Sequence, residues 1–119
     1  LLADHYADTR DLYQHYLEAN GYRVVLADSG EAAIRAAQTW LPDIILMDIR
    51  MPDISGADAM RVLKRDQRFA KTPIVAFTAN ALESARAECV AAGFDAVIVK
   101  PCLPDALLKQ IARLCAPAA

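Results

Sequence analysis

Long hydrophobic runs, a dominant charge and paired cysteines are all missing from this sequence. Its longest apolar runs are four or five residues, whereas a membrane-spanning helix needs about 20. The formal net charge is −2, and no segment is dominated by Lys or Arg. Because nucleic-acid binding depends on clustered positive charge, we expect neither membrane insertion nor direct nucleic-acid binding.

Other absences narrow the class of protein further. The three cysteines, Cys89, Cys102 and Cys115, are an odd number without CxxC spacing, which favours reduced, buried thiols in a cytoplasmic protein. No charged-then-apolar signal sequence opens the chain, so secretion is not expected. No GxGxxG motif follows an expected strand, which argues against a dinucleotide-binding domain.

The length sets the domain organisation. With 119 residues, the chain can bury a core without disulfides or a structural metal. We expect a single domain over residues 1–119, in which residues 116–119 form an Ala/Pro tail. Leu1–Ala3 is expected to be the end of a first strand whose beginning lies outside this numbering.

The segment that includes Ile44–Met47 is the clearest structural signal that is present. Four apolar residues run without interruption into Asp48, and Pro52 and Gly56 follow closely. Such a run between turn residues is typical of a strand buried on both faces of a parallel sheet. Because ligands bind at the carboxyl ends of such strands, Asp48 is placed where chemistry is expected.

The rest of the chain alternates between strand and helix patterns. The expected strands are Leu1–Ala3, Arg23–Ala27, Asp43–Met47, Ile74–Phe77 and Ala96–Val99. Five helices are expected: one capped by Asp8 or Thr9 and ended by Gly21, one from Ser29 to about Pro42, one from Gly56 to about Asp66, one over Ala81–Ala92 and one from Pro104. Short connections between alternating strands and helices predict a parallel sheet with helices on both faces. Trp40 is expected in the core or at its boundary.

Polar side chains follow four of the five expected strands. They are Asp4 and His5 after the first strand, Asp48 after the third, Thr78 after the fourth and Lys100 after the fifth. Alone, each has an ordinary explanation, because carboxylates and threonines often cap helices and a lysine is usually solvated. Together on one rim, they favour a site with a shared chemical task.

Phosphoryl transfer onto a carboxylate is the chemistry that this set suits. Asp48 would be the nucleophile and would form an acyl phosphate. Asp4 and Asp48 would hold Mg²⁺, which prefers oxygen ligands. Lys100 and the Thr78 hydroxyl would donate hydrogen bonds to phosphoryl oxygens.

The sequence resembles the receiver domains of two-component response regulators over essentially its whole length. The motifs that carry the resemblance are Asp4 with Asp8–Arg10, Asp48–Pro52 with Gly56, Phe77–Ala81, Gly93–Asp95 and Val99–Pro101. The resemblance implies a flavodoxin-like (βα)5 doubly wound sandwich with a five-stranded parallel sheet. It also implies a cytoplasmic phosphorelay protein, not an enzyme beyond its self-catalysed phosphotransfer and dephosphorylation.

Site roles follow from the same resemblance. Asp48 would accept a phosphoryl group from a sensor histidine kinase or a histidine phosphotransfer protein, and Thr78 and Lys100 would sense it. The backbone carbonyl of Arg50 would ligate Mg²⁺, and the Lys100–Pro101 peptide would be cis. Phosphorylation would switch the surface of the fourth helix, fifth strand and fifth helix, through which a homodimer could form.

Two positions depart from the family pattern. The family has a second acidic residue, a direct Mg²⁺ ligand, where this chain has His5. Since imidazole suits zinc, copper or nickel better than magnesium, we expect weakened Mg²⁺ binding and treat His5 as the weakest candidate ligand. Val97 stands where the family commonly has a tyrosine or phenylalanine that rotates with the threonine.

Two other hypotheses are considered, and the departures bear on the first. The first is a pseudo-receiver, a docking or dimerisation module that works without phosphorylation. The second is a phosphatase of the haloacid dehalogenase type, which also uses an aspartate after a buried strand. That family needs a second acid two residues after the nucleophile, where this chain has Arg50, so the phosphatase is disfavoured.

Overall fold

The computed structural model contains a five-stranded, fully parallel sheet in the order β2-β1-β3-β4-β5. It describes residues 1–79, 82–100 and 104–115. The strands are β1 (Leu2–Ala3), β2 (Leu26–Ala27), β3 (Ile45–Met47), β4 (Ile74–Thr78) and β5 (Ala96–Val99). The helices are α1 (Ala7–Ala19), α2 (Gly30–Trp40), α3 (Gly56–Lys64), α4 (Glu83–Ala92) and α5 (Pro104–Cys115), with a short 3-10 helix η1 (Gln67–Phe69). The predicted doubly wound α/β fold is therefore confirmed.

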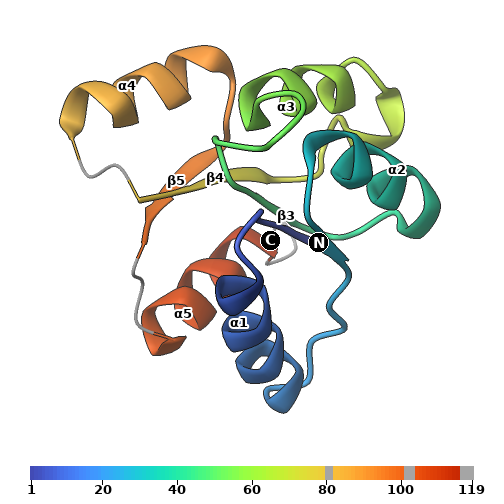
Figure 1. Cartoon of the computed structure of the whole chain (residues 1–119), viewed down its shortest axis with the longest axis vertical. Coiled ribbons are helices and arrows are strands. Elements are labelled where there is room, and N and C mark those ends of the chain that lie inside the picture. The colour runs from blue at the N-terminus through green and yellow to red at the C-terminus, as the bar shows by residue number, and fades with distance from the viewer. Residues whose placement is uncertain (80–81, 101–103, 116–119) are drawn as a thin grey trace.

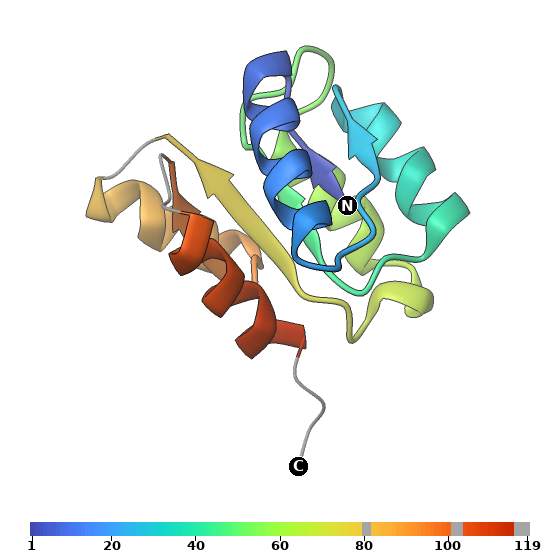
Figure 2. The ribbon, with the colours of Figure 1, turned by 90° about the horizontal axis from the view of Figure 1, so that it is seen from below.

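Helices cover both faces of the sheet. Helices α2, α3 and α4 lie on one face and α1 and α5 on the other (Figures 1 and 2). The residues of β4 alternate between the two faces. Ile74 and Ala76 belong to the core under α2–α4, while Val75 and Phe77 belong to the core under α1 and α5. Successive strand residues point to opposite faces, so a sheet covered twice needs apolar residues at every position.

Local sequence signals explain where several helices begin and end. The Ser29 hydroxyl accepts a hydrogen bond from the Ala32 amide and caps α2 as predicted. Gly93 ends α4 with a φ of 119°, a left-handed conformation that glycine adopts at little cost. Leu107 and Ile111 of α5 are buried in the core beside α1, as the spacing of apolar residues on the last helix predicts.

Some predicted boundaries were wrong. Helix α1 begins after Tyr6, not at Asp8 or Thr9, because Asp4 accepts a hydrogen bond from the Tyr6 amide and so turns the chain one residue before the helix. Strand β2 covers only Leu26–Ala27 of the second predicted strand, and the Val25 carbonyl before it accepts the Leu2 amide. It is an edge strand that pairs with the short β1.

Two further corrections concern the segments after α2 and α3. Helix α3 ends at Lys64, and the Asp66 carboxylate caps the unpredicted η1 by accepting the Arg68 amide. Trp40 is 60% exposed, not in the core. It is the last residue of α2, beyond the buried positions of that helix, and Leu41 then leaves the helix in a left-handed conformation.

A few predictions fall on residues that the structure does not describe. They are the start of the fourth helix at Ala81, the Lys100–Pro101 peptide, Cys102 and the tail over residues 116–119. Cys89 is buried as predicted, while Cys115 is only half-buried. Among the helices that are described, none is both long and apolar enough to cross a membrane.

Candidate functional site at the carboxyl edge of the sheet

The carboxyl ends of four strands bring the predicted polar residues together. Asp4 follows β1 and Asp48 follows β3, and these strands pair in register through Ala3 and Met47. Thr78 ends β4, and its carbonyl accepts a hydrogen bond of 2.7 Å from the Lys100 amide directly after β5. Since parallel strands all end at one edge, residues far apart in the sequence meet there.

Asp48 is buried and has polar neighbours on both carboxylate oxygens. Its Oδ2 lies 3.3 Å from His5 Nδ1 and 3.5 Å from Lys100 Nζ. Its Oδ1 accepts a hydrogen bond of 3.3 Å from the Arg50 amide. Gly56 is needed beside this loop, because a Cβ there would overlap the Asp48 carbonyl oxygen.

Asp4 is the most deeply buried acid of the site, with no solvent exposure. Its Oδ2 lies 2.7 Å from Lys100 Nζ, and its Oδ1 accepts the Tyr6 amide at 2.9 Å. The Arg10 guanidinium donates to the Asp4 carbonyl oxygen at 2.7 Å. Lys100 therefore bridges both buried carboxylates and supplies the charge compensation that buried acids require.

A cavity of about 270 Å³ opens beside these groups. Its lining residues are His5, Tyr6, Asp48, Arg50, Thr78, Ala79 and Lys100. One water molecule occupies about 30 Å³ in the liquid, so the cavity has room for several. A phosphoryl group therefore has space next to the Asp48 carboxylate.

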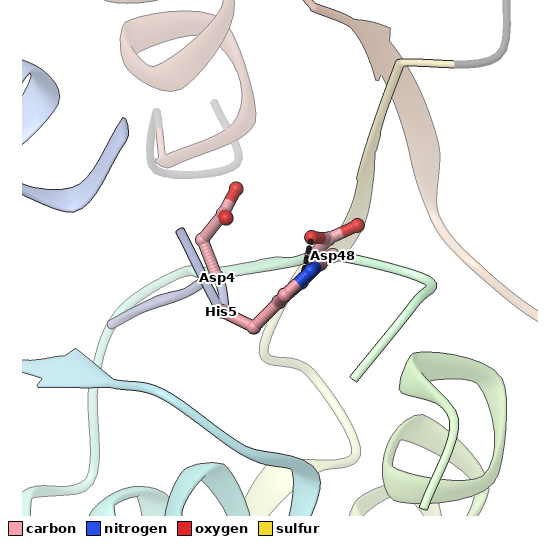
Figure 3. A group of neighbouring side chains, drawn as sticks. All are labelled: Asp4, His5 and Asp48. Carbon is pink, nitrogen blue, oxygen red and sulfur yellow. Dashed lines mark hydrogen bonds and ion pairs between the residues drawn. The ribbon is translucent and has the colours of Figure 1, made fainter. Parts of the chain in front are cut away.

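Asp4, His5 and Asp48 also form a group that could hold a metal ion (Figure 3). One ligand atom from each residue lies within 4.8 Å of the others. The His5 ring lies toward Asp48 in Figure 3, and it contacts the Tyr6 ring at a centroid distance of 3.9 Å. The predicted role of the Arg50 carbonyl as a metal ligand stays a prediction.

Reasoning from the sequence missed two neighbours of the site. Tyr6 both lines the cavity and binds the Asp4 carboxylate through its amide, and Arg10 binds the Asp4 carbonyl oxygen. The position of Arg10 one helical turn after Tyr6 is a usable signal, because such residues lie on one face of a helix.

This fold and site define a class of protein: a doubly wound α/β domain with an acidic pocket at the carboxyl edge of its parallel sheet. The chain belongs to the response regulator receiver domain family, whose family model matches residues 1–112. The family assignment drawn from the sequence motifs is thereby confirmed.

Individual relatives are similar over most of the chain. The polar-differentiation response regulator DivK of Brucella ovis is 36% identical over 90 residues, which are 76% of this chain and 73% of DivK. The chemotaxis protein CheY4 of Vibrio cholerae superposes with a TM-score of 0.88 at 29% identity, over 95% of this chain and 94% of CheY4.

A third relative carries a metal. The receiver domain of the sensor histidine kinase PA1611 from Pseudomonas aeruginosa PAO1 has a TM-score of 0.86 at 32% identity, over 98% of this chain and 96% of that domain. It was solved with a magnesium ion coordinated in its active-site cleft. Receiver domains generally bind Mg²⁺ in an acidic site.

The residues of this chain fit Mg²⁺ only in part. The Asp4 and Asp48 carboxylates are the hard oxygen ligands that Mg²⁺ prefers. The third group is the His5 imidazole, a nitrogen donor that suits transition metals better. This donor set fits a divalent cation, but it is not the all-oxygen set of a typical magnesium site.

Proposed function

We propose that this domain is a phosphoacceptor switch in a two-component phosphorelay, with Asp48 as the acceptor. The observation that carries the proposal is the position of the Asp48 carboxylate, which is buried at the end of β3 and faces a cavity that Thr78 and Lys100 also line. The proposed acceptor carboxylate and two hydrogen-bond donors for phosphoryl oxygens therefore border one space.

The reaction is a group transfer between two nucleophiles. A carboxylate oxygen of Asp48 attacks the phosphorus atom of a phosphohistidine on a kinase or phosphotransfer protein. A P–O bond forms, the P–N bond breaks, and its electron pair stays on the donor imidazole, which takes up a proton from solvent. A divalent cation held by Asp4 and Asp48 would supply positive charge for the phosphoryl oxygens.

The residues of this chain position and bind the transferred group. Lys100 Nζ lies 3.5 Å from the acceptor oxygen, so a small movement brings it to a phosphoryl oxygen as a charged donor. Thr78 borders the same cavity and offers a hydroxyl. Transfer of the Lys100 contact from Asp4 to the phosphoryl group would move the Lys100 side chain away from Asp4.

The output and partners are proposed on the same basis. The added charge of about −1.5 to −2 would shift the surface of α4, β5 and α5, which would bind a partner or a second copy of the domain. Val97 of β5 is half-buried against the α2–α4 core and lacks the aromatic ring that would swing inward, so the signal would pass through movement of the loops.

We propose a cytoplasmic domain with no catalytic activity beyond its own phosphorylation and dephosphorylation.

A docking module that works without phosphorylation is the second candidate. It is favoured by the contacts that already engage the acceptor, since both His5 Nδ1 and Lys100 Nζ approach Asp48 Oδ2. In this candidate the pocket is a stabilised polar cluster and not a reactive site.

The deciding experiment is incubation with acetyl phosphate and with a phosphorylated histidine phosphotransfer protein, each with Mg²⁺ and then with Mn²⁺. We expect intact-mass spectrometry to show one added phosphoryl group on the wild type and none on Asp48→Asn. Asp58→Asn is the matched control, because Asp58 lies on the exposed side of α3; it should be modified like the wild type. An unmodified wild type with every donor and cation would overturn the proposal and favour the docking module.

A further inference from the structure

We propose that the cation site formed by Asp4, His5 and Asp48 selects a metal such as Zn²⁺ or Ni²⁺, which accepts an imidazole ligand, over Mg²⁺. The location of the site rests on the proposed function, because the metal would lie beside the phosphoacceptor. The selectivity rests on residues of this chain alone: Asp4, His5 and Asp48.

The geometry of the cluster suits such a metal. Zinc bonds to nitrogen and oxygen ligands are about 2.0–2.2 Å long, so a tetrahedral ion holds its ligand atoms about 3.4 Å apart. The three ligand atoms already lie within 4.8 Å of one another. Asp4 and Asp48 are buried, so a small rotation of His5, whose side chain is 31% exposed, would close the group.

Contacts with neighbouring residues hold the ligands in place. The Tyr6 ring packs against the His5 imidazole, and the Tyr6 amide binds one oxygen of Asp4. His5 Nδ1 already faces the Asp48 carboxylate. Preset orientation of this kind lowers the cost of collecting ligands around an ion.

Competition with Lys100 is a cost that every cation must overcome, so the added bond to His5 decides which cation binds. Lys100 Nζ lies 2.7 Å from Asp4 Oδ2 and 3.5 Å from Asp48 Oδ2, so any cation must displace an ammonium group from both carboxylates. Mg²⁺ loses water reluctantly and gains little from imidazole. A zinc-type ion gains a metal–nitrogen bond from His5 that the lysine cannot replace.

Zinc-titrated NMR of the histidine side chains tests the proposal directly, with the metal alone and no phosphodonor. The chain has two histidines, and His15 lies exposed on α1, so it serves as an internal reference. We expect Zn²⁺ to shift the imidazole nitrogen signals of His5 and to leave those of His15 unchanged. Zinc that shifts neither histidine, for example because cysteine thiols hold it, would overturn the proposal.

Calorimetric titration of the full chain gives the selectivity. We expect Zn²⁺ to bind the wild type at least about 100-fold more tightly than Mg²⁺. In His5→Asp, Zn²⁺ affinity should fall and Mg²⁺ affinity should rise, each about tenfold. His15→Gln is the matched control and should bind both metals as the wild type does. Equal metal preferences in the wild type and His5→Asp would refute the assignment.

Failure of this inference is distinguishable from failure of the proposed function. Phosphorylation of Asp48 with Mg²⁺, together with unshifted His5 signals in Zn²⁺, would refute the metal selectivity and leave the phosphoacceptor role intact. Shifted His5 signals in a protein that no donor phosphorylates would support the metal site and refute the phosphoacceptor role.

Discussion

Lys100 illustrates how much of the pocket at the carboxyl edge of the sheet depends on one side chain. Its ammonium group lies against the carboxylates of Asp4 and Asp48, both of which are buried, and 5.4 Å from the centre of the Phe77 ring. An acid in such a place is stable in its charged form only with a partner. The lysine therefore stabilises the folded domain.

Replacement of Lys100 by methionine should lower the free energy of unfolding by about 3 kcal/mol, because it leaves buried carboxylates without their counter-charge. Urea denaturation at neutral pH measures the loss. In the double variant Lys100→Met/Asp4→Asn, part of the stability should return, since one of the two unpaired charges is gone. Equal or greater loss in the double variant would contradict this account of the pocket.

At the scale of elements, the loop after Asp48 is tied to the start of α2. The Asp53 carboxylate accepts the Gly30 amide at 2.8 Å and the Glu31 amide at 2.9 Å. Amides at a helix N-terminus have no acceptor within the helix, so they favour a negative charge nearby. The hydrogen bond from the Glu31 amide, the largest cause, with those from the Ile54 and Gly30 amides, holds the pKa of Asp53 below its ordinary value of 3.8.

The lowered pKa of Asp53 gives its stabilisation a definite pH dependence. The contribution should be fully present above the unfolded-state pKa and should disappear as the pH falls through the lower, folded-state pKa. Asp53→Ala should therefore be less stable than the wild type in urea at pH 7, and the difference should narrow at pH 3. For comparison, Asp11→Asn, at an exposed acid on α1, should change stability little at either pH.

Helix α5 attaches to the sheet mainly through its apolar face. Leu107 is fully buried against the core that α1 and α5 share. Leu107→Ala should lower the free energy of unfolding by about 3 kcal/mol through lost burial and a residual cavity. Leu12→Ala on α1, where the leucine is 59% exposed, should change it by less than about 0.5 kcal/mol. Similar losses from both variants in denaturant unfolding would show that α5 is not packed as described.

At the scale of the whole molecule, the pocket at the carboxyl edge joins both halves of the sheet. Its residues come from the ends of β1, β3, β4 and β5, and the helices that follow these strands lie on both faces. A group bound between them contacts elements that are separate in the sequence. Binding there should stabilise the native state as a unit.

Beryllofluoride, which mimics a phosphoryl group, should therefore raise the thermal unfolding midpoint in the presence of a divalent cation. A ligand at 100 times its dissociation constant adds about 2.7 kcal/mol to the free energy of unfolding, which corresponds to a rise of roughly 10 °C in a domain of this size. Differential scanning fluorimetry measures the rise. The same additions should leave Asp48→Asn unchanged, and an equal rise in that variant would place the ligand elsewhere.

Local sequence patterns predict much of this fold. The apolar run before Asp48 predicts a strand buried on both faces, and Ser29 and Gly93 mark helix ends where the structure has them. The errors are at edges. Strand β2 is shorter than its β-branched sequence suggests, and Trp40 is exposed at the end of α2, because pairing and burial there depend on which neighbour is present.

The sequence alone was sufficient to place Asp4, Asp48, Thr78 and Lys100 at strand ends, because parallel strands share one carboxyl edge. The sequence alone could not predict which of these side chains contact one another. The contacts of Lys100 with Asp4, 96 positions away, and of His5 with Asp48, 43 positions away, depend on strand order, register and side-chain direction. Tertiary structure decides these, because only the assembled sheet brings such distant residues within bonding distance.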